Sequence, residues 1–250
     1  CEARDTTQLK IMQLVVLETN IKGVGLGDRI DYLCTANMLA QQADDDFITI
    51  HKRYTPNPTQ KQEFICWDEL SSLFKPRHMI LEMSDNFHNN LKFLNYPRYN
   101  IGSKNDDYQN LLSSLGDFPK IKVKDYSKEM PPLPKKFITM QWDAGQQRRR
   151  CSEDEIQRTV DFYKDLGYDI IGVGGQAGNA MLRNDLHKIA YIMSKADLHV
   201  GVDSGFMHLA KIVMPSNKIH IYTSNFTHQF VSTQLQNVLN AGAILNYSRK

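Results

Sequence analysis

The sequence predicts an α/β protein built from two doubly wound parallel sheets that are joined by a short linker. Apolar, β-branched runs bounded by glycine and polar residues alternate with segments of helical periodicity. A proline-rich stretch between charged residues, KEMPPLPKK (128–136), divides this alternation into two parts. We therefore expect an N-terminal domain over residues 1–127, a linker over 128–136 and a C-terminal domain over 137–250.

The first part opens with a strand, a glycine-rich loop and a helix. Residues 9–19 form an apolar run typical of a buried strand, and the glycines of GVGLGD (23–28) follow as a tight loop. From Asp28 onward, apolar residues recur at helical spacing. The next apolar run, 46–54, favours a second strand, and HMILEM (78–83) is a further candidate strand.

The second part alternates strand and helix regularly. A helix over 152–167 is indicated by Ser152 as N-cap, by acidic residues in the first turn, and by Gly167 as its C-terminal stop. The other elements complete the doubly wound pattern, with strands at 136–142, 168–175, 197–205 and 217–224 and helices at 184–196, 206–213 and 228–240.

Composition and charge narrow the function classes. The chain has 250 residues, of which 41% are hydrophobic and 23% charged, as in ordinary soluble globular proteins. The net charge of +2 disfavours a nucleic-acid partner. Residues 131–250 hold 14 Lys and Arg against 10 Asp and Glu, which suits an anionic ligand in that half.

The four cysteines carry no CxxC spacing, so we expect reduced thiols in a cytoplasmic protein. No apolar run has the length of a membrane span, and no signal peptide is recognisable. Because the chain begins at Cys1 rather than Met, we expect that it has been trimmed, with a lipidated cysteine as the alternative.

Motifs of several enzyme classes are missing from the sequence. It contains no GxxxxGK[ST] phosphate-binding loop, no GxSxG serine-hydrolase elbow and no HExxH metal motif, so no metal ligands are predicted. GVGGQAG (172–178) has its third glycine one position late for the GxGxxG of nicotinamide enzymes. We interpret Gly174 and Gly175 instead as part of a loop that borders a nucleotide.

GVDSGFMHLA (201–210) places small and polar residues where a parallel strand ends and a helix begins. Ligands bind at such ends in open α/β sheets. Gly205 would let a ligand approach the backbone, and the amides that open the helix would favour an anion. Asp203 and Ser204 could bind sugar hydroxyls, and His208 could reach a phosphate. The alternative is that Asp203 and Ser204 cap the helix and that His208 is packed in the core.

Two further stretches carry candidate site residues. QQRRRCS (146–152) places Arg148 and Arg149 just before a helix, where guanidinium groups can clamp a diphosphate. A solvated basic turn is the alternative. Asp28, at the predicted helix start, would be kept ionised by the helix dipole and could serve as a general base. The alternative is an acid that only caps its own helix.

These pieces, in this order, resemble a known enzyme family. MSKADLHVGVDSGFMHLAKIVMPSNKIHIY (193–222) is similar to the segment of family 9, heptosyltransferase-like glycosyltransferases that runs helix, Ala-Asp-Leu, strand, Asp-Ser/Thr-Gly, x-x-His-Leu-Ala, strand. GLGD (25–28) resembles the family's Gly-x-Gly-Asp. MQWDAGQQRRRCSEDE (140–155) and YDIIGVGGQ (168–176) resemble its diphosphate and nucleoside loops, although Cys151-Ser152 replaces a common Trp-Pro.

The resemblance implies a GT-B-like fold, in which two Rossmann-like domains face a cleft. It implies a metal-independent transferase, without a cofactor, that moves a sugar from a nucleotide-diphosphate sugar to an acceptor hydroxyl. The acceptor would be a glycan or another hydroxyl compound, and a membrane-linked acceptor would add a peripheral membrane contact. Asp28 takes the position of the general base. The donor-binding positions are Gly25, Gly27, Arg148, Arg149, Gly174, Gly175, Asp203, Ser204, Gly205 and His208.

Other functions remain open on the sequence alone. One is a different GT-B enzyme, either a sugar-nucleotide epimerase or a transferase that glycosylates a DNA base. A second is a non-catalytic module that binds a nucleotide sugar without turning it over. A Rossmann dehydrogenase is the third, and the misplaced third glycine of 172–178 disfavours it.

Overall fold

The computed structural model describes most of the second half of the chain and selected parts of the first. The predicted helix at 228–240 lies outside the described residues. For the strands at 14–19, 46–52, 78–83, 98–100 and 245–247, only the backbone is described. The described residues are 14–19, 26–27, 30–31, 33–34, 46–52, 72–73, 78–83, 98–100, 120–144, 149–173, 185–223, 242 and 244–247.

The first sheet has four parallel strands in the order β3-β2-β1-β4. β1 (Leu14–Thr19) pairs with β2 (Asp46–Lys52) on one side and with β4 (Arg98–Asn100) on the other, and β3 (His78–Met83) pairs with β2. The strand order reverses at β1, so the chain leaves β1 at a position where parallel sheets bind ligands. The predictions of β1, β2 and β3 are confirmed. β4 was not predicted, because its three residues are too few to show a period.

The second sheet has five parallel strands in the order β6-β5-β7-β8-β9. Its order reverses between β5 and β7, so the turns that follow these two strands share one end of the sheet. β9 was not predicted, whereas the other four strands were. The bounds are β5 (Phe137–Gln141), β6 (Asp169–Gly172), β7 (Leu198–Val202), β8 (Ile219–Thr223) and β9 (Ile244–Tyr247).

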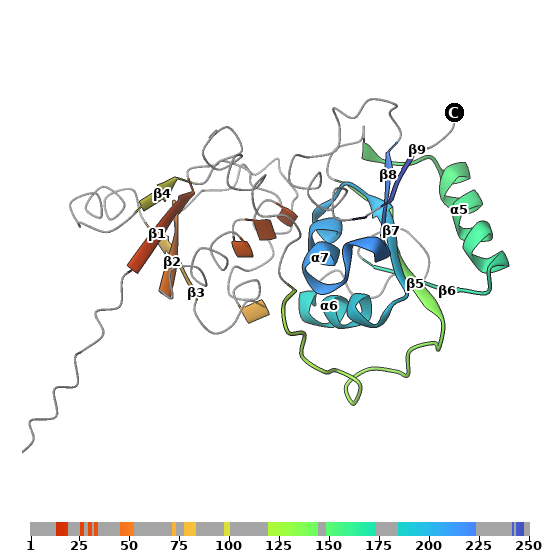
Figure 1. Ribbon diagram of the computed structural model, residues 1–250, viewed down its shortest axis with the longest axis horizontal. Helices are drawn as coiled ribbons and strands as arrows, with labels where there is room; N and C mark the ends of the chain where they lie inside the picture. Colours follow the sequence, from red (N-terminus) through yellow and green to blue (C-terminus); the bar gives the residue numbers. More distant parts are fainter. Residues whose placement is uncertain are drawn as a thin grey trace, which may run out of the picture.

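Helices cover both faces of the second sheet (Figure 1). α6 (Leu186–Lys195) and α7 (Gly205–Val213) lie on one face, and α5 (Glu153–Asp165) lies on the other. The side chains of β5 alternate accordingly: Phe137 joins the core cluster of α6 and α7, and Ile138 joins the cluster beside α5. The predicted class, a mixed α/β protein with parallel sheets, is confirmed.

Local sequence signals set the ends of α5. The Ser152 hydroxyl accepts a hydrogen bond from the Glu155 amide at 3.3 Å, and the Glu155 carboxylate accepts one from the Ser152 amide at 2.7 Å. This reciprocal pair is a capping box. Gly167 follows the last turn with φ +79°, a backbone conformation that suits glycine. Both predicted ends of this helix are confirmed.

The N-terminal helical segment consists of the described helical residues Leu26, Gly27, Ile30, Asp31, Leu33 and Cys34. Ile30, Leu33 and Cys34 are buried in the same core cluster as α6 and α7, so this part of the first half packs against the second half. The prediction that the helix starts at Asp28, after a loop of glycines, is wrong. Leu26 and Gly27 are already helical, and Gly27 occupies a position in which no larger residue fits, as described below.

Residues 120–136, the described part of the connection between the two sheets, contain no helix or strand. The Ile121 amide donates to the Ile212 carbonyl at 2.8 Å, and Lys120 Nζ donates to the Lys211 carbonyl at 2.9 Å. The connection therefore runs along the C-terminal end of α7. The predicted linker, 128–136, falls inside this segment, and the division of the chain into two domains stays a prediction.

Candidate functional site

The turn from β7 into α7 carries the centre of the candidate site. Ser204 occupies the N-cap position of α7 by its backbone conformation, but its side chain makes no capping hydrogen bond. Its hydroxyl instead donates to Gln141 Oε1 at 2.6 Å, and Gln141 is the last residue of β5. The turn is thereby tied to the neighbouring strand, and the serine side chain caps none of the amides that open α7, although the Ser204 carbonyl accepts from the Met207 amide at 3.0 Å. The alternative to a ligand role supposed that Ser204 caps the helix, and the Ser204 side chain does not do so.

Of the two described arginines in the run 148–150, Arg149 reaches this turn. Arg149 lies with a guanidinium nitrogen 3.4 Å from Asp203 Oδ1 and 3.3 Å from the Asp203 carbonyl oxygen. Its side chain is 29% exposed, whereas that of Asp203 is 5% exposed. Arg150 instead donates to the Ala144 carbonyl at 2.9 Å. Arg149 thus combines a fixed position with access to solvent, which a residue that clamps an anion requires.

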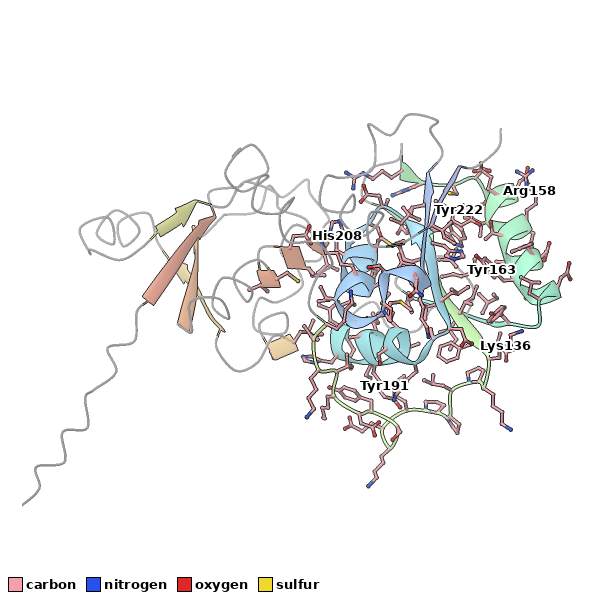
Figure 2. The ribbon with its side chains drawn as sticks, viewed as in Figure 1. Lys136, Arg158, Tyr163, Tyr191, His208 and Tyr222 are labelled. Carbon is pink, nitrogen blue, oxygen red and sulfur yellow. The ribbon has the colours of Figure 1, made fainter. Side chains whose placement is uncertain are left out.

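His208 is buried on the first turns of α7 and bridges two carboxylates. Its Nδ1 lies 3.0 Å from Asp31 Oδ1 and 2.9 Å from Asp31 Oδ2, and its Nε2 lies 3.7 Å from Asp203 Oδ1. Figure 2 shows His208 on the side of α7 that faces the N-terminal helical segment. Burial by itself would lower the pKa of His208, but the charge of Asp31 and the hydrogen bonds to Asp31 and Asp203 together outweigh burial and raise that pKa to about 8.

Lys211 lies one turn beyond His208 and is fully buried. Its ammonium group forms an ion pair with Asp31 Oδ1 and lies 3.4 Å from His208 Nδ1. Burial would raise the pKa of Asp31, but His208 and Lys211 together hold it below its ordinary value. Asp31 is therefore an ionised carboxylate that contacts two cationic side chains of α7.

Five charged or titratable side chains thus form one row with alternating sign. Sequence reasoning missed two of them, Asp31 and Lys211. The sequence did hold a signal that Lys211 is buried. Apart from Lys211 and His208, all residues of FMHLAKIV are apolar, so the helix has no polar face on which a lysine would be exposed. The row runs Arg149, Asp203, His208, Asp31 and Lys211; we call it the charge row.

Two glycines of the predicted donor site are positions of close packing within the protein. A Cβ atom on Gly27 would lie 2.6 Å from Cδ2 of His208, and one on Gly205 would lie 2.7 Å from Cβ of Leu26. Neither distance is compatible with a side chain. The glycines thus bring the N-terminal helical segment against the start of α7, and their contact with a donor stays a prediction.

Several predicted site residues lie outside the described residues, namely Gly25, Asp28, Arg148, Gly174 and Gly175. Gly27 and Ile30, which flank Asp28 in the chain, are buried. Among the described residues, no group of three or more His, Cys, Asp or Glu could hold a metal ion. No helix in the described part is both long and apolar enough to cross a membrane.

No protein-family model matches this chain, and no curated protein sequence is significantly similar to it. Solved structures do match. The iron-containing dodecameric glycosyltransferase TibC from enterotoxigenic E. coli H10407 superposes with a TM-score of 0.55 at 11% identity, over 84% of this chain and 58% of TibC. E. coli heptosyltransferase WaaC with ADP gives 0.57 at 11% identity, over 95% of this chain and 94% of WaaC.

A glycosyltransferase family 9 protein from Veillonella parvula DSM 2008 gives a TM-score of 0.53 at 15% identity, over 95% of this chain and 88% of that protein. TibC has also been solved in complex with ADP-D-beta-D-heptose. The chain spans less than two thirds of TibC and nearly the whole of WaaC. At these identities the comparison establishes a shared fold, and the resemblance to family 9 glycosyltransferases is confirmed at that level. The arrangement of two domains around a cleft stays a prediction.

Proposed function

We propose that the chain is a glycosyltransferase that transfers a sugar from a nucleoside-diphosphate sugar to an acceptor hydroxyl. The main support is the β7–α7 turn. On a fold shared with family 9 glycosyltransferases, Arg149 and His208 converge on Asp203 at the switch point of the second sheet. Because WaaC and TibC have been solved with ADP and ADP-heptose, an ADP-linked sugar is the first donor to test.

The leaving diphosphate would lie at the N-terminus of α7. Backbone amides and the helix dipole favour an anion there, and the Ser204 side chain does not compete for the amides because its hydroxyl donates to Gln141. Arg149 would add a guanidinium fork. Negative charge that develops on the leaving group would be stabilised by these protein donors, so the proposed reaction needs no metal ion.

Asp28 would act as the general base that removes the proton of the acceptor hydroxyl as this oxygen attacks the anomeric carbon. A positioned base contributes about 10²- to 10⁴-fold to a rate. The support for this role is its place in the chain, between two residues of the N-terminal helical segment that are buried beside α7. A glycan or another hydroxyl compound would be the acceptor, and the reaction would take place in the cytoplasm, with peripheral contact where the acceptor is membrane-linked.

A thermal-shift panel tests the donor class. It contains ADP, GDP, UDP, CDP and their sugars, with NADH as the probe for a dehydrogenase, each with and without magnesium. A ligand at about 100 times its Kd stabilises the folded state by about 2.7 kcal/mol, which is a clear rise in Tm. Stabilisation by one nucleoside diphosphate without magnesium supports the proposal. Stabilisation by NADH alone, or by no nucleotide, overturns it.

Release of the nucleoside diphosphate from its sugar then separates an enzyme from a binding module. Turnover in the presence of an acceptor hydroxyl supports a transferase. Tight binding of the nucleotide sugar without any release of nucleoside diphosphate, with any acceptor or with water, would identify a non-catalytic module. Conversion of the bound sugar into an isomer that remains attached to the nucleotide would identify an epimerase.

A further inference from the structure

Asp31 is a buried carboxylate that the proposed chemistry does not use. It is 0% exposed and belongs to the N-terminal helical segment, whereas both of its cationic partners, His208 and Lys211, belong to α7. An ionised group in such a place costs several kcal/mol unless charged partners compensate it. A leucine or alanine would fill a packing position at lower cost, so the charge requires an explanation.

The geometry around His208 explains why a charged residue lies at position 31. The Asp31 carboxylate lies within 3.0 Å of Nδ1, so Nδ1 carries a proton and donates it in a hydrogen bond. This contact fixes the plane of the imidazole ring and leaves Nε2 directed at the β7–α7 turn, 3.7 Å from Asp203 Oδ1. A ring held in this way presents Nε2 to whatever lies at that turn.

The net charge of the charge row depends on whether the His208 ring is protonated. Arg149 and Lys211 carry positive charge, and Asp203 and Asp31 carry negative charge, so these four cancel. His208 alone therefore sets the net charge of the row, which is zero when the ring is neutral and +1 when it is protonated. Cys34, which also lies near Asp31 and Lys211, stays neutral because burial raises the pKa of its thiol to about 12.

We propose that Asp31 is a positioning residue for His208. It holds the imidazole in the charged form, with Nε2–H directed at the diphosphate of the donor, and Lys211 balances the charge of Asp31. The assignment of a diphosphate as the ligand rests on the proposed function. The effect of Asp31 on the protonation of His208 does not.

Two variants change the protonation of His208 in opposite directions. In Asp31→Asn/Lys211→Met both charges of the buried pair are removed together, which avoids leaving one of them uncompensated. The ring then loses the carboxylate that favours its charged form, so the pH at which His208 titrates falls. Lys211→Met alone removes a cation that opposes protonation and keeps Asp31, so that pH rises. A role of Asp31 limited to folding does not predict the fall in Asp31→Asn/Lys211→Met.

Histidine NMR of the ligand-free protein measures this directly. In the ¹⁵N-labelled wild type, the His208 ring should titrate near pH 8, with Nδ1 protonated at every pH at which the ring is neutral. We expect a lower midpoint in Asp31→Asn/Lys211→Met and a higher one in Lys211→Met. An unchanged midpoint in folded Asp31→Asn/Lys211→Met overturns the proposal. If that variant does not fold, a neutral His208 ring in wild type or in Lys211→Met that carries its proton on Nε2 rather than on Nδ1 overturns it.

Calorimetric titration with ADP from pH 7 to 9.5 tests the ligand. His208→Gln, measured over the same range, corrects for the titration of ADP itself. Wild-type affinity should fall as the pH rises through about 8, and at pH 7.5 the Kd of Asp31→Asn/Lys211→Met should be about 10-fold or more above that of wild type, since a charged hydrogen bond is lost. Equal affinities overturn the role in donor binding. If wild type binds no nucleotide while the NMR shifts appear as expected, the proposed function fails and the control of His208 by Asp31 stands.

Discussion

Replacing Gly205 by alanine tests whether the start of α7 is closed by protein or open to a ligand. The new Cβ would lie 2.7 Å from Cβ of Leu26 and 2.9 Å from its Cγ and Cδ2. Since a Cβ atom cannot be moved by a rotamer change, the helices themselves must separate. Overpacking of this kind costs about 1–3 kcal/mol, and the better helix propensity of alanine returns up to about 1 kcal/mol. The expected net loss of stability therefore lies between about 0 and 3 kcal/mol, centred near 1–2 kcal/mol.

The assay is thermal unfolding combined with a double-mutant cycle. For a chain of this size, each kcal/mol lowers Tm by about 2–4 °C. The partner change is Leu26→Gly, because it removes the Cβ that clashes. In the Leu26→Gly background, Gly205→Ala should be neutral or stabilising, so the two changes should couple by about 1–3 kcal/mol.

Two results would refute this reasoning. If Gly205→Ala costs the same with and without Leu26→Gly, then Leu26 does not fill the space in front of the glycine. If Gly205→Ala leaves Tm unchanged but abolishes binding of ADP, then a ligand approaches the backbone at Gly205, as the sequence pattern alone suggested.

Three further outcomes follow from the proposed site. Asp28→Asn should lower the rate of ADP release in the presence of acceptor by about 10²- to 10⁴-fold while the Kd for ADP is retained; unchanged turnover would remove Asp28 from the mechanism. Arg149→Ala should raise the Kd for ADP by about 10- to 100-fold through the loss of charge-assisted hydrogen bonds. Arg150→Ala is its matched control, because Arg150 contacts Asp143 and Ala144 rather than Asp203; equal effects of the two changes would place the clamp elsewhere. Addition of EDTA should leave turnover unchanged, and loss of activity that magnesium restores would show that a metal takes part.

Much of the fold was predictable because local signals and long-range packing agree in it. α5 has a serine and a glutamate at capping-box spacing and a glycine after its last turn, and it forms between these residues. Strands β5 to β8 are rich in apolar residues, as buried parallel strands are, so their runs are visible in the sequence, although Thr139 and His199 form a buried polar pair among them. β4 and β9 escaped prediction because they are short and depend on pairing with β1 and β8.

The site was predictable in part for a different reason. The turn of Asp203 and Ser204 is local, so its residues are adjacent in the sequence and their pattern can be read directly. Asp31 and His208 are 177 residues apart in the chain, and the contact between them exists only after the two halves have packed. A charged residue in a helix ordinarily predicts a solvent-exposed face, so pattern reasoning had no means of placing Asp31 in the interior.

The position of Asp31 also bears on how the chain can be divided. A fragment that starts at Lys120 would keep the second sheet together with α5, α6 and α7, and it would be the natural choice for an isolated second half. That fragment would also carry the Lys211 ammonium without the Asp31 carboxylate that it contacts in the interior. It would also lose Ile30, Leu33 and Cys34, which are buried in the same core cluster as residues of α6 and α7, so apolar surface of that cluster would become exposed to water. The second half is therefore expected to be less stable without this segment, and dissection of this protein should carry residues 26–34 along with residues 120–250.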